Sequence, residues 1–268
     1  MTTRFAAVGD VHGEMDLMVE LLREREASHG PFEFVLQVGD LEPHRHEQDL
    51  ASMAAPAKYR DLGDFPTYHR GERALPWPVC FVGGNHEPYG WLDELPAGGE
   101  LIENCRYLGR AGVAELGGLR VVGLSGIHRE RDYERPRPGP GERCSPKERI
   151  GFREGEVEAA LAHGRADVLV LHDWPSGIDQ GLPTGLRRGA GGFGNEPARL
   201  LVELLRPRLV LCGHMHFRHR ARVPLRGTGG AAEVCCLAKV SHSPPPGAAR
   251  EDAVAVFEVR GGRPVELI

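Results

Sequence analysis

Side chains that bind metal ions recur in five short motifs of this sequence. The motifs are Gly9-Asp10-Val11-His12-Gly13, Gly39-Asp40, Gly84-Asn85-His86-Glu87, His172-Asp173-Trp174-Pro175 and Gly213-His214-Met215-His216. Their mixture of oxygen and nitrogen donors suits manganese, iron or zinc ions and lacks the thiolates of a structural zinc site. The predicted ligands of a pair of divalent ions are Asp10, His12, Asp40, Asn85, His172, His214 and His216.

A pair of divalent ions of this kind suits the hydrolysis of phosphoesters. Two ions about 4 Å apart can clamp the attacking and leaving oxygens of an in-line displacement. We expect the Asp40 carboxylate to bridge the ions, and a water held between them to become the hydroxide that attacks phosphorus. The leaving oxygen then needs a proton, and His86, adjacent to a predicted ligand, is the expected general acid.

The alternative reading is that these histidines are ordinary surface or core residues. A single histidine, or an isolated His-x-His step, is usually of that kind. The combination is more specific, because Asn is scarce in this chain and occurs only at Asn85, Asn104 and Asn195. In addition, each motif follows a short apolar run. We therefore interpret the five motifs together as one dinuclear metal site.

Apolar runs that resemble β-strands precede the motifs. They cover residues 5–8, 34–38, 78–82, 167–171 and 209–212, and helical patterns fit residues 14–25, 154–163 and 195–205. This alternation predicts an α/β fold, in which active sites gather at the carboxyl ends of the strands. Further strands at 119–124, 231–238 and 253–260 look antiparallel, so we expect two packed sheets with helices outside.

Composition limits the class of protein. The 268 residues are 41% hydrophobic and 26% charged, as in a soluble globular protein, and suit a single domain over 1–268. No apolar run is long enough to span a bilayer, and residues 1–10 contain no signal-peptide core. The six cysteines show no C-x-x-C spacing, which favours reduced thiols and a cytoplasmic location.

Three segments read as loops. A Pro-rich insertion covers about 128–148, a Gly-rich stretch covers 181–194, and Ser-Pro-Pro-Pro-Gly lies within 241–250. The last two have no role that the residues indicate. The net charge of −5 argues against a generally basic, nucleic-acid-binding surface, although it leaves room for a local basic groove.

The five motifs resemble those of the calcineurin-like metallophosphoesterase superfamily, whose pattern is D-x-H, G-D, G-N-H-[DE], H and G-H-x-H. The resemblance implies a four-layer αββα sandwich of two mixed β-sheets flanked by helices. It also implies a division of the ligands, with His86 as the acid. One ion takes Asp10, His12, Asp40 and His216, and the other takes Asp40, Asn85, His172 and His214.

Within the superfamily, the chain is most similar to RNA lariat debranching enzymes. The similar stretches are 49–60 (with Asp49-Leu50, Met53, Pro56 and Lys58-Tyr59-Arg60), 83–87, 95–99, 107–109, 123–127, 132–133 and 172–175. The phosphoprotein-phosphatase branch is less similar, because its Asp-Arg-Gly step after Gly-Asp is missing here. Debranching enzymes typically carry Cys where this chain has Asp10. An aspartate there favours two full metal positions.

Basic residues near the motifs are candidates for substrate contacts. The resemblance makes 125–153 the counterpart of the loop that recognises lariat RNA, and this segment holds eight basic and five acidic residues, a net charge of +3. Such a loop suits a nucleic-acid backbone, although a solvated surface loop would have a similar composition. After His216, Arg218, Arg220 and Arg222 would share one face of a strand. The candidate contacts are Arg45, Lys58, Arg60, Arg129, Arg131, Arg149 and Arg218.

We therefore expect a metal-dependent phosphodiesterase that hydrolyses nucleic acid, with RNA and its 2′,5′ branched linkage as the expected substrate. A nucleotide or phosphoprotein phosphatase is the alternative, since the same metals serve both reactions. A non-catalytic scaffold of the same fold would lack ligands, whereas all seven are present. Manganese is the expected ion, with iron, zinc or nickel as alternatives; membrane partners are not expected, and protein partners and oligomeric state are left open.

Overall fold

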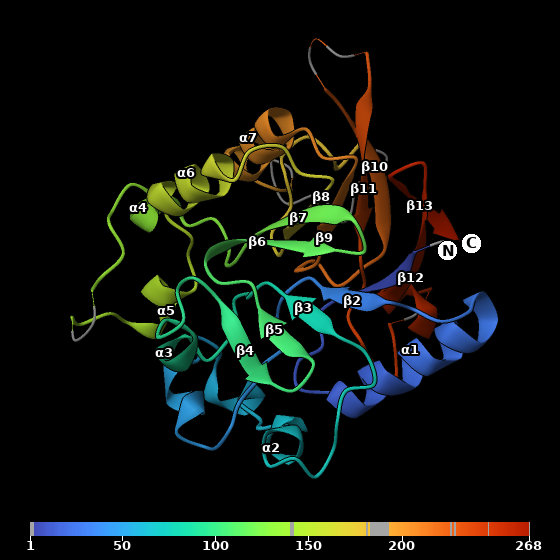
Figure 1. The fold of residues 1–268 in the computed structure, drawn as a ribbon. Coiled ribbons are helices and arrows are strands. Elements are labelled where there is room, and N and C mark those ends of the chain that lie inside the picture. Colours follow the sequence, from blue (N-terminus) through green and yellow to red (C-terminus); the bar gives the residue numbers. More distant parts are fainter. Residues whose placement is uncertain are drawn as a thin grey trace.

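The computed structural model describes residues 3–139, 142–180, 182, 193–225, 227, 229–245 and 247–267. Two β-sheets pack face to face at the centre, and helices cover both outer faces (Figure 1). The predicted α/β class and the αββα sandwich of two mixed sheets are therefore confirmed. No helix within these ranges is long and apolar enough to cross a membrane. A single domain over 1–268 stays a prediction.

The first sheet has seven strands in the order β13-β12-β1-β2-β3-β5-β4. Strands β1, β2, β3 and β5 run parallel, and β12, β13 and β4 join them in antiparallel pairs. The strands are β1 (Arg4–Val8), β2 (Phe34–Gln37), β3 (Val79–Phe81), β4 (Gly99–Ile102), β5 (Cys105–Tyr107), β12 (Val254–Arg260) and β13 (Arg263–Leu267).

The second sheet has six strands in the order β10-β11-β9-β8-β7-β6. Its four central strands are parallel, and the two edge strands are antiparallel to their neighbours. The strands are β6 (Ala111–Leu116), β7 (Leu119–Leu124), β8 (Val168–Leu171), β9 (Leu209–Cys212), β10 (His219–Pro224) and β11 (Ala231–Cys236). Strands β8 and β9 are buried throughout, as expected of parallel strands covered on both faces.

Helices α1 (Met15–His29), α2 (Phe65–His69) and α3 (Tyr89–Leu92) pack on the outer face of the seven-stranded sheet. Helices α6 (Glu154–Ala162) and α7 (Glu196–Leu205) pack on the outer face of the six-stranded sheet. The remaining short elements are α4 (Glu130–Tyr133), α5 (Pro146–Arg149) and the 3₁₀ turns η1 (Asp49–Ser52), η2 (Ala57–Tyr59) and η4 (Arg250–Ala253).

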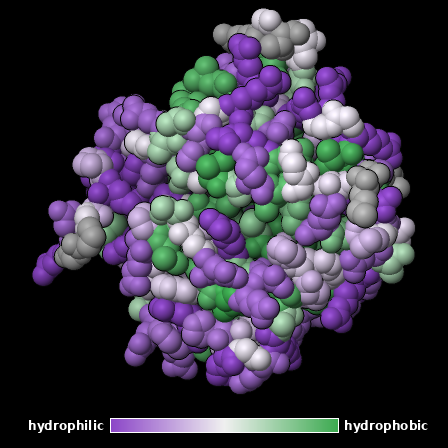
Figure 2. Space-filling model, viewed as in Figure 1, coloured by the Kyte–Doolittle hydropathy of each residue, from purple (hydrophilic) through white to green (hydrophobic). Residues whose placement is uncertain are grey.

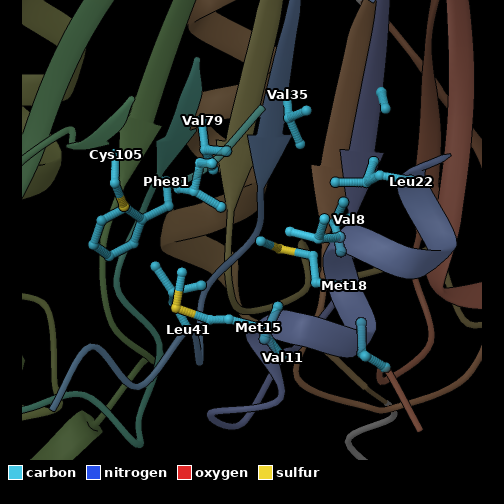
Figure 3. Close-up of a cluster of buried hydrophobic side chains, with 14 of the residues drawn as sticks. Val8, Val11, Met15, Met18, Leu22, Val35, Leu41, Val79, Phe81 and Cys105 are labelled. Carbon is cyan, nitrogen blue, oxygen red and sulfur yellow. The ribbon is translucent and has the colours of Figure 1, made fainter. Parts of the chain in front are cut away.

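Three apolar clusters hold the layers together. Figure 3 shows part of the first, in which Met15, Met18 and Leu22 of α1 pack against Val8 and Val35 of the sheet. A second cluster joins α6 and α7 to the six-stranded sheet, and a third fills the space between the sheets. Because the inner cluster contains side chains from β1, β2, β8 and β9, it fixes the carboxyl ends of these strands relative to one another.

The strands and helices expected from the sequence are present, with two corrections. The 128–148 segment is not a loop throughout, since it contains α4 and the first residues of α5. Strands β7 and β11 are antiparallel to one neighbour but parallel to the other, so the antiparallel expectation for them was wrong in part. The short α2, α3, β4, β5, β6 and β13 had no clear periodic signal and were not predicted.

The remaining loop predictions are located as follows. Most of the Gly-rich segment 181–194 lies outside the described residues, as do positions 140–141 and 246 of the two other loops. Around the connection from α4 to α5, the coloured side chains at the left of Figure 2 are mostly hydrophilic. The described part of 241–250 contains no helix or strand before η4 begins at Arg250.

Candidate metal centre

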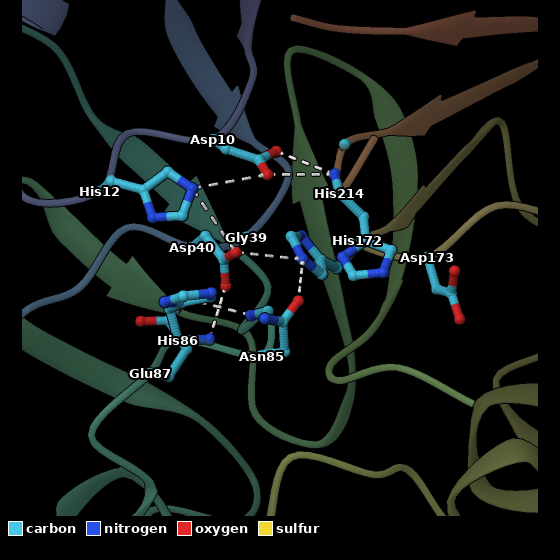
Figure 4. Close-up of polar contacts among 12 residues, drawn as sticks. Asp10, His12, Gly39, Asp40, Asn85, His86, Glu87, His172, Asp173 and His214 are labelled. Atoms are coloured by element: carbon cyan, nitrogen blue, oxygen red, sulfur yellow. Dashed lines mark hydrogen bonds and ion pairs between the residues drawn. The ribbon is translucent and has the colours of Figure 1, made fainter. Parts of the chain in front are cut away.

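The predicted ligands converge at one point from both sheets. Asp10 and His12 follow β1, Asp40 follows β2, Asn85 follows β3, His172 follows β8, and His214 and His216 follow β9. Figure 4 shows six of these side chains gathered in one place, namely Asp10, His12, Asp40, Asn85, His172 and His214. The carboxyl ends of five strands thus bring together residues that are up to 206 positions apart in the sequence.

Four of the seven side chains form a compact group. Ligand atoms of Asp10, His12, Asp40 and His216 all lie within 4.8 Å of one another. Nε2 of His12 is 3.9 Å from Asp10 Oδ2, 3.8 Å from Asp40 Oδ2 and 3.1 Å from His216 Nε2. Nε2 of His216 is 3.0 Å from Asp10 Oδ2. This arrangement can hold one metal ion.

Of the other three side chains, His172 adjoins Asp40, and Asn85 and His214 adjoin His172. Nε2 of His172 lies 3.4 Å from Asp40 Oδ2 and 3.1 Å from Asn85 Oδ1. The ring of His214 lies beside that of His172, with ring centroids 5.0 Å apart, and its backbone N–H donates to Asp10 Oδ1 at 3.0 Å. Asp40 therefore contacts both His12 of the first group and His172 of the second, while its bridging role stays a prediction.

The charges at the centre fit a metal cation. The Asp10 and Asp40 carboxylates are fully or almost fully buried, and within the described ranges only histidines lie within 4 Å of them as cationic partners. Burial alone would raise the pKa of the Asp40 carboxyl, but His172 and then His12 hold it well below its usual range. Likewise burial alone would lower the pKa of the His172 ring, whereas the two carboxylates raise it to about 10. Buried anions that attract protons this strongly are suited to bind divalent ions.

Two of the imidazole rings are held so that Nε2 points into the centre. Nδ1 of His172 donates to the Val38 carbonyl oxygen at 2.9 Å, and Nδ1 of His12 donates to Glu42 Oε1 at 2.7 Å. A histidine whose Nδ1 donates to a carbonyl or carboxylate presents an unprotonated Nε2 to a metal, which is the usual arrangement in metalloproteins.

The backbone at the centre has left-handed conformations that non-glycine residues rarely adopt. The φ angle is 48° at His12, 54° at Asp40, 68° at His214 and 60° at His216, and Glu42 has 59°. Only two other non-glycine residues of the described chain, Asn104 and Arg206, have positive φ. Such strain, concentrated where the ligands leave their strands, is typical of functional sites.

Two carboxylates of the centre were not predicted as site residues. Glu87 is completely buried and accepts backbone N–H groups from Leu41, Glu42 and Gly84. Its burial, and secondarily the Asp40 carboxylate, raise the pKa of the Glu87 carboxyl to about 8. The G-N-H-E motif contained the signal for Glu87, whereas no motif pointed to Glu42.

His86, the expected acid, lies beside the seven predicted metal ligands and is not one of them. Its backbone N–H donates to Asp40 Oδ1 at 2.7 Å, and its ring meets that of His12 edge-on, with centroids 4.9 Å apart. Burial lowers the pKa of the His86 ring, and the Asp40 carboxylate opposes this only in part. The ring is partly exposed to solvent, so a substrate can reach it.

Four of the seven predicted substrate-contact residues are engaged by acidic side chains. Arg45 pairs with Asp49, Arg129 with Asp132, Arg149 with Asp93 and Arg218 with Glu266. The Arg218 side chain lies in a separate hollow with Arg25, His29 and residues of β12 and β13, which contains no predicted ligand. These four arginines therefore offer a substrate less positive charge than unpaired arginines would.

The other three candidates, Lys58, Arg60 and Arg131, are exposed. Lys58 lies over the Tyr59 ring, and Arg60 donates to the Ala55 carbonyl oxygen. Arg45 and Arg149 also line one open hollow of about 470 Å³, together with His46, Ser52, Trp91 and Cys144 among others. Arg45 stacks on the Trp91 ring there, 4.0 Å from its centroid.

Comparison with known proteins agrees with this geometry. The model of one family, calcineurin-like phosphoesterase, matches residues 3–218, which contain every predicted ligand. The chain belongs to the calcineurin-like phosphoesterase family. Members of this family use divalent metals, which agrees with the donor set and the buried carboxylates described above.

Curated relatives narrow the comparison. Lariat debranching enzymes of Caenorhabditis briggsae, Arabidopsis thaliana and Homo sapiens are 36%, 33% and 34% identical, over 84%, 88% and 81% of this chain. The matches cover 48%, 60% and 43% of those proteins, so the chain spans about half the length of the curated relatives it matches.

Solved structures support the fold. A dimetal phosphatase from Danio rerio matches 95% of this chain and 92% of its own, with a TM-score of 0.54 and 16% identity. A Thermus thermophilus protein matches 100% of this chain and 99% of its own, with a TM-score of 0.54 and 14% identity. At such identities the likeness concerns the fold alone.

The glycines of the motifs generate a testable prediction. A Cβ atom at Gly84 would lie 2.2 Å from Asp40 Oδ1 and 2.7 Å from His172 Cε1, so Gly84→Ala must displace one of these side chains. We expect at least a tenfold loss of metal affinity, measured by calorimetric titration of the metal-free protein. Gly155→Ala is the matched control, because a Cβ there meets open space within α6. Equal metal affinity of the two variants would contradict the assignment of Asp40 and His172.

Proposed function

We propose that the chain is a metal-dependent phosphodiesterase that hydrolyses nucleic acid, with RNA as the substrate. The observation that carries the proposal is the pair of buried carboxylates, Asp10 and Asp40, enclosed by histidine nitrogens at one edge of both sheets. The similarity to lariat debranching enzymes over more than four-fifths of the chain supports RNA, and by extension a 2′,5′ branched linkage.

Two divalent ions are proposed for the centre. Asp40 has a neighbour on each side, with His12 3.8 Å and His172 3.4 Å from the same oxygen, Oδ2. This supports the division into one position with Asp10, His12, Asp40 and His216, and a second with Asp40, Asn85, His172 and His214. Manganese is our preferred ion, and iron, zinc or nickel would suit the same donors. The six free cysteines agree with a reducing, cytoplasmic location.

The ions, when bound, would lower the pKa of a coordinated water and neutralise charge on the phosphate oxygens. The protein's own residues have separate tasks. The Val38 carbonyl oxygen keeps His172 in one orientation, and the backbone N–H of His86 fixes Asp40. The exposed edge of His86 is available to donate a proton to the leaving oxygen. A bound phosphate would favour the protonated ring, since a negative charge nearby raises the pKa of a histidine.

Contacts with the nucleic-acid backbone are proposed for Lys58, Arg60 and Arg131, whose charges are exposed. Arg45 and Arg149 would contribute from the hollow that they line with Trp91. Arg129 and Arg218 stay candidates, although each is paired with an acidic side chain. Backbone contacts of this kind position a nucleic acid without reading its sequence.

A phosphatase acting on nucleotides or phosphoproteins is the second candidate, because the same metal centre suits both reactions. A non-catalytic scaffold is less well supported, since all seven predicted ligands are present and converge.

The first test compares substrate classes. Protein loaded with Mn²⁺ is assayed on bis(4-nitrophenyl) phosphate and on 4-nitrophenyl phosphate, and we expect kcat/KM to be at least tenfold higher for the diester. Turnover of the monoester alone would contradict the diesterase proposal and favour the phosphatase. Inactivity on both with Mn²⁺, Fe²⁺, Zn²⁺ and Ni²⁺ would favour the scaffold. Branched 2′,5′ RNA should be cleaved faster than linear RNA, and equal rates would remove the branch preference.

The second test concerns His86. The His86→Ala variant should lose about 10²–10⁴-fold in kcat on RNA, whose leaving alkoxide needs a proton, and much less on the nitrophenyl diester, whose leaving group is stable as an anion. His29→Ala, at the far end of α1, serves as the control. If His86→Ala cleaved RNA at the wild-type rate, another residue would have to be the acid.

A further inference from the structure

One buried carboxylate, that of Glu42, has three histidine rings around it. Oε1 of Glu42 lies 2.7 Å from Nδ1 of His12 and 3.5 Å from Nδ1 of His86. Oε2 lies 3.8 Å from Nε2 of His44. Glu42 itself is 3% exposed, so it reaches solvent hardly at all and its charge acts mainly on these rings.

The carboxylate is held in place by its own backbone. Glu42 has the left-handed φ of 59°, which a side chain of its type rarely adopts. Its N–H and that of Leu41 donate to the two oxygens of the buried Glu87, each at 3.0 Å. Glu87 therefore locks the conformation that turns Glu42 toward the metal centre, at a cost in backbone strain that a residue with no role would not require.

The consequence for His12 is direct. Its Nδ1–H donates to Glu42 at 2.7 Å, the length of a charge-assisted hydrogen bond. When the ring is neutral, its proton is therefore on Nδ1, and Nε2 faces Asp10, Asp40 and His216 as the nitrogen that can bind an ion. Glu42 thus selects the ring orientation and tautomer that the metal centre needs.

The consequence for His86 follows from an unmet hydrogen bond. Nδ1 of His86 is buried and has no hydrogen-bond partner among the described residues. The main chain of His86 is fixed by its bond to Asp40, so the ring is the part that can turn. Nδ1 of His86 is 3.5 Å from Glu42 Oε1, and a small rotation of the ring would bring its N–H within hydrogen-bond range of that oxygen. Nε2 is then the ring nitrogen that faces outward.

We propose that Glu42 is a shared positioning residue, which orients the metal ligand His12 and the proton donor His86 with one carboxylate. The inference rests on the proposed phosphodiesterase function. In that reaction the proton passes from Nε2 of His86 to the leaving oxygen as its bond to phosphorus breaks. The ring becomes neutral and keeps its Nδ1–H on Glu42. The Glu42 carboxylate thereby fixes the orientation of the His86 ring relative to the metal ligand His12.

A third metal ion held by His12, Glu42 and His86 is the alternative, since their ligand atoms also lie within 4.8 Å of one another. The short bond between His12 Nδ1 and Glu42 argues against it, because that nitrogen already carries a proton. The number of bound metal ions per chain distinguishes the two arrangements.

The test uses Glu42→Ala and Glu42→Gln, with Glu47→Gln as the matched control, because Glu47 is an exposed carboxylate in the same loop. For Glu42→Ala we expect kcat on RNA to fall about 100-fold, as expected for loss of general-acid catalysis. On bis(4-nitrophenyl) phosphate the fall should be about tenfold at low metal concentration and should disappear at saturating metal. Glu42→Gln keeps a neutral acceptor facing both His12 and His86, so it should retain more metal affinity and more activity on RNA than Glu42→Ala.

A second readout does not depend on activity. In the metal-free protein, ¹H–¹⁵N correlation spectra at a pH where the rings are neutral should show His12 and His86 as Nδ1–H tautomers, and Glu42→Ala should convert both toward Nε2–H. Equal losses on both substrates at saturating metal, unchanged tautomers, or three bound ions per wild-type chain would each overturn the proposal. Inactivity of the wild-type protein on both diesters would count against the phosphodiesterase itself, while the spectra would still test the role of Glu42.

Discussion

The structure depends on the attraction between two buried carboxylates and the positive charge that must accompany them. Asp10 and Asp40 each have an oxygen within 4 Å of the same His12 nitrogen, and both are removed from solvent. Leaving a buried anion without compensating charge would cost roughly 5 kcal/mol. The two carboxylates raise the pKa of the His172 ring, which shows how strongly they favour a neighbouring positive charge, and divalent ions would supply that charge. Metal binding at Asp10 and Asp40 should therefore increase the free energy of unfolding of the protein.

The fold satisfies this constraint by using both sheets. Parallel strands end at the same edge, so β1, β2 and β3 of one sheet and β8 and β9 of the other deliver short polar turns to one line. The apolar cluster between the sheets fixes the separation of these turns. Glycines at positions 39, 84 and 213 leave room where a Cβ would meet His172, Asp40 or Asp10. Packing between and around the sheets thus fixes where the ligands lie.

Sequence patterns were sufficient for the parts of the molecule that are periodic or carry unusual residue types. Strand β8, for example, is a run of buried aliphatic residues. The His-x-His step after β9 indicates a metal site only in combination with the four motifs that precede it. Glu42 could not be recognised, because its role arises from a left-handed turn and from contacts with residues 30 and 44 positions away. The substrate-contact arginines were overestimated for a similar reason. Two of their acidic partners, Asp93 for Arg149 and Glu266 for Arg218, are distant in sequence.

The most direct test of the central claim is anomalous diffraction from crystals of the protein grown with Mn²⁺, recorded near the manganese absorption edge. The account predicts two anomalous peaks about 3.5–4 Å apart, one on each side of the Asp40 carboxylate. The first should lie against Asp10, His12 and His216, and the second against Asn85, His172 and His214. A single peak, or peaks that do not share Asp40, would contradict the dinuclear centre.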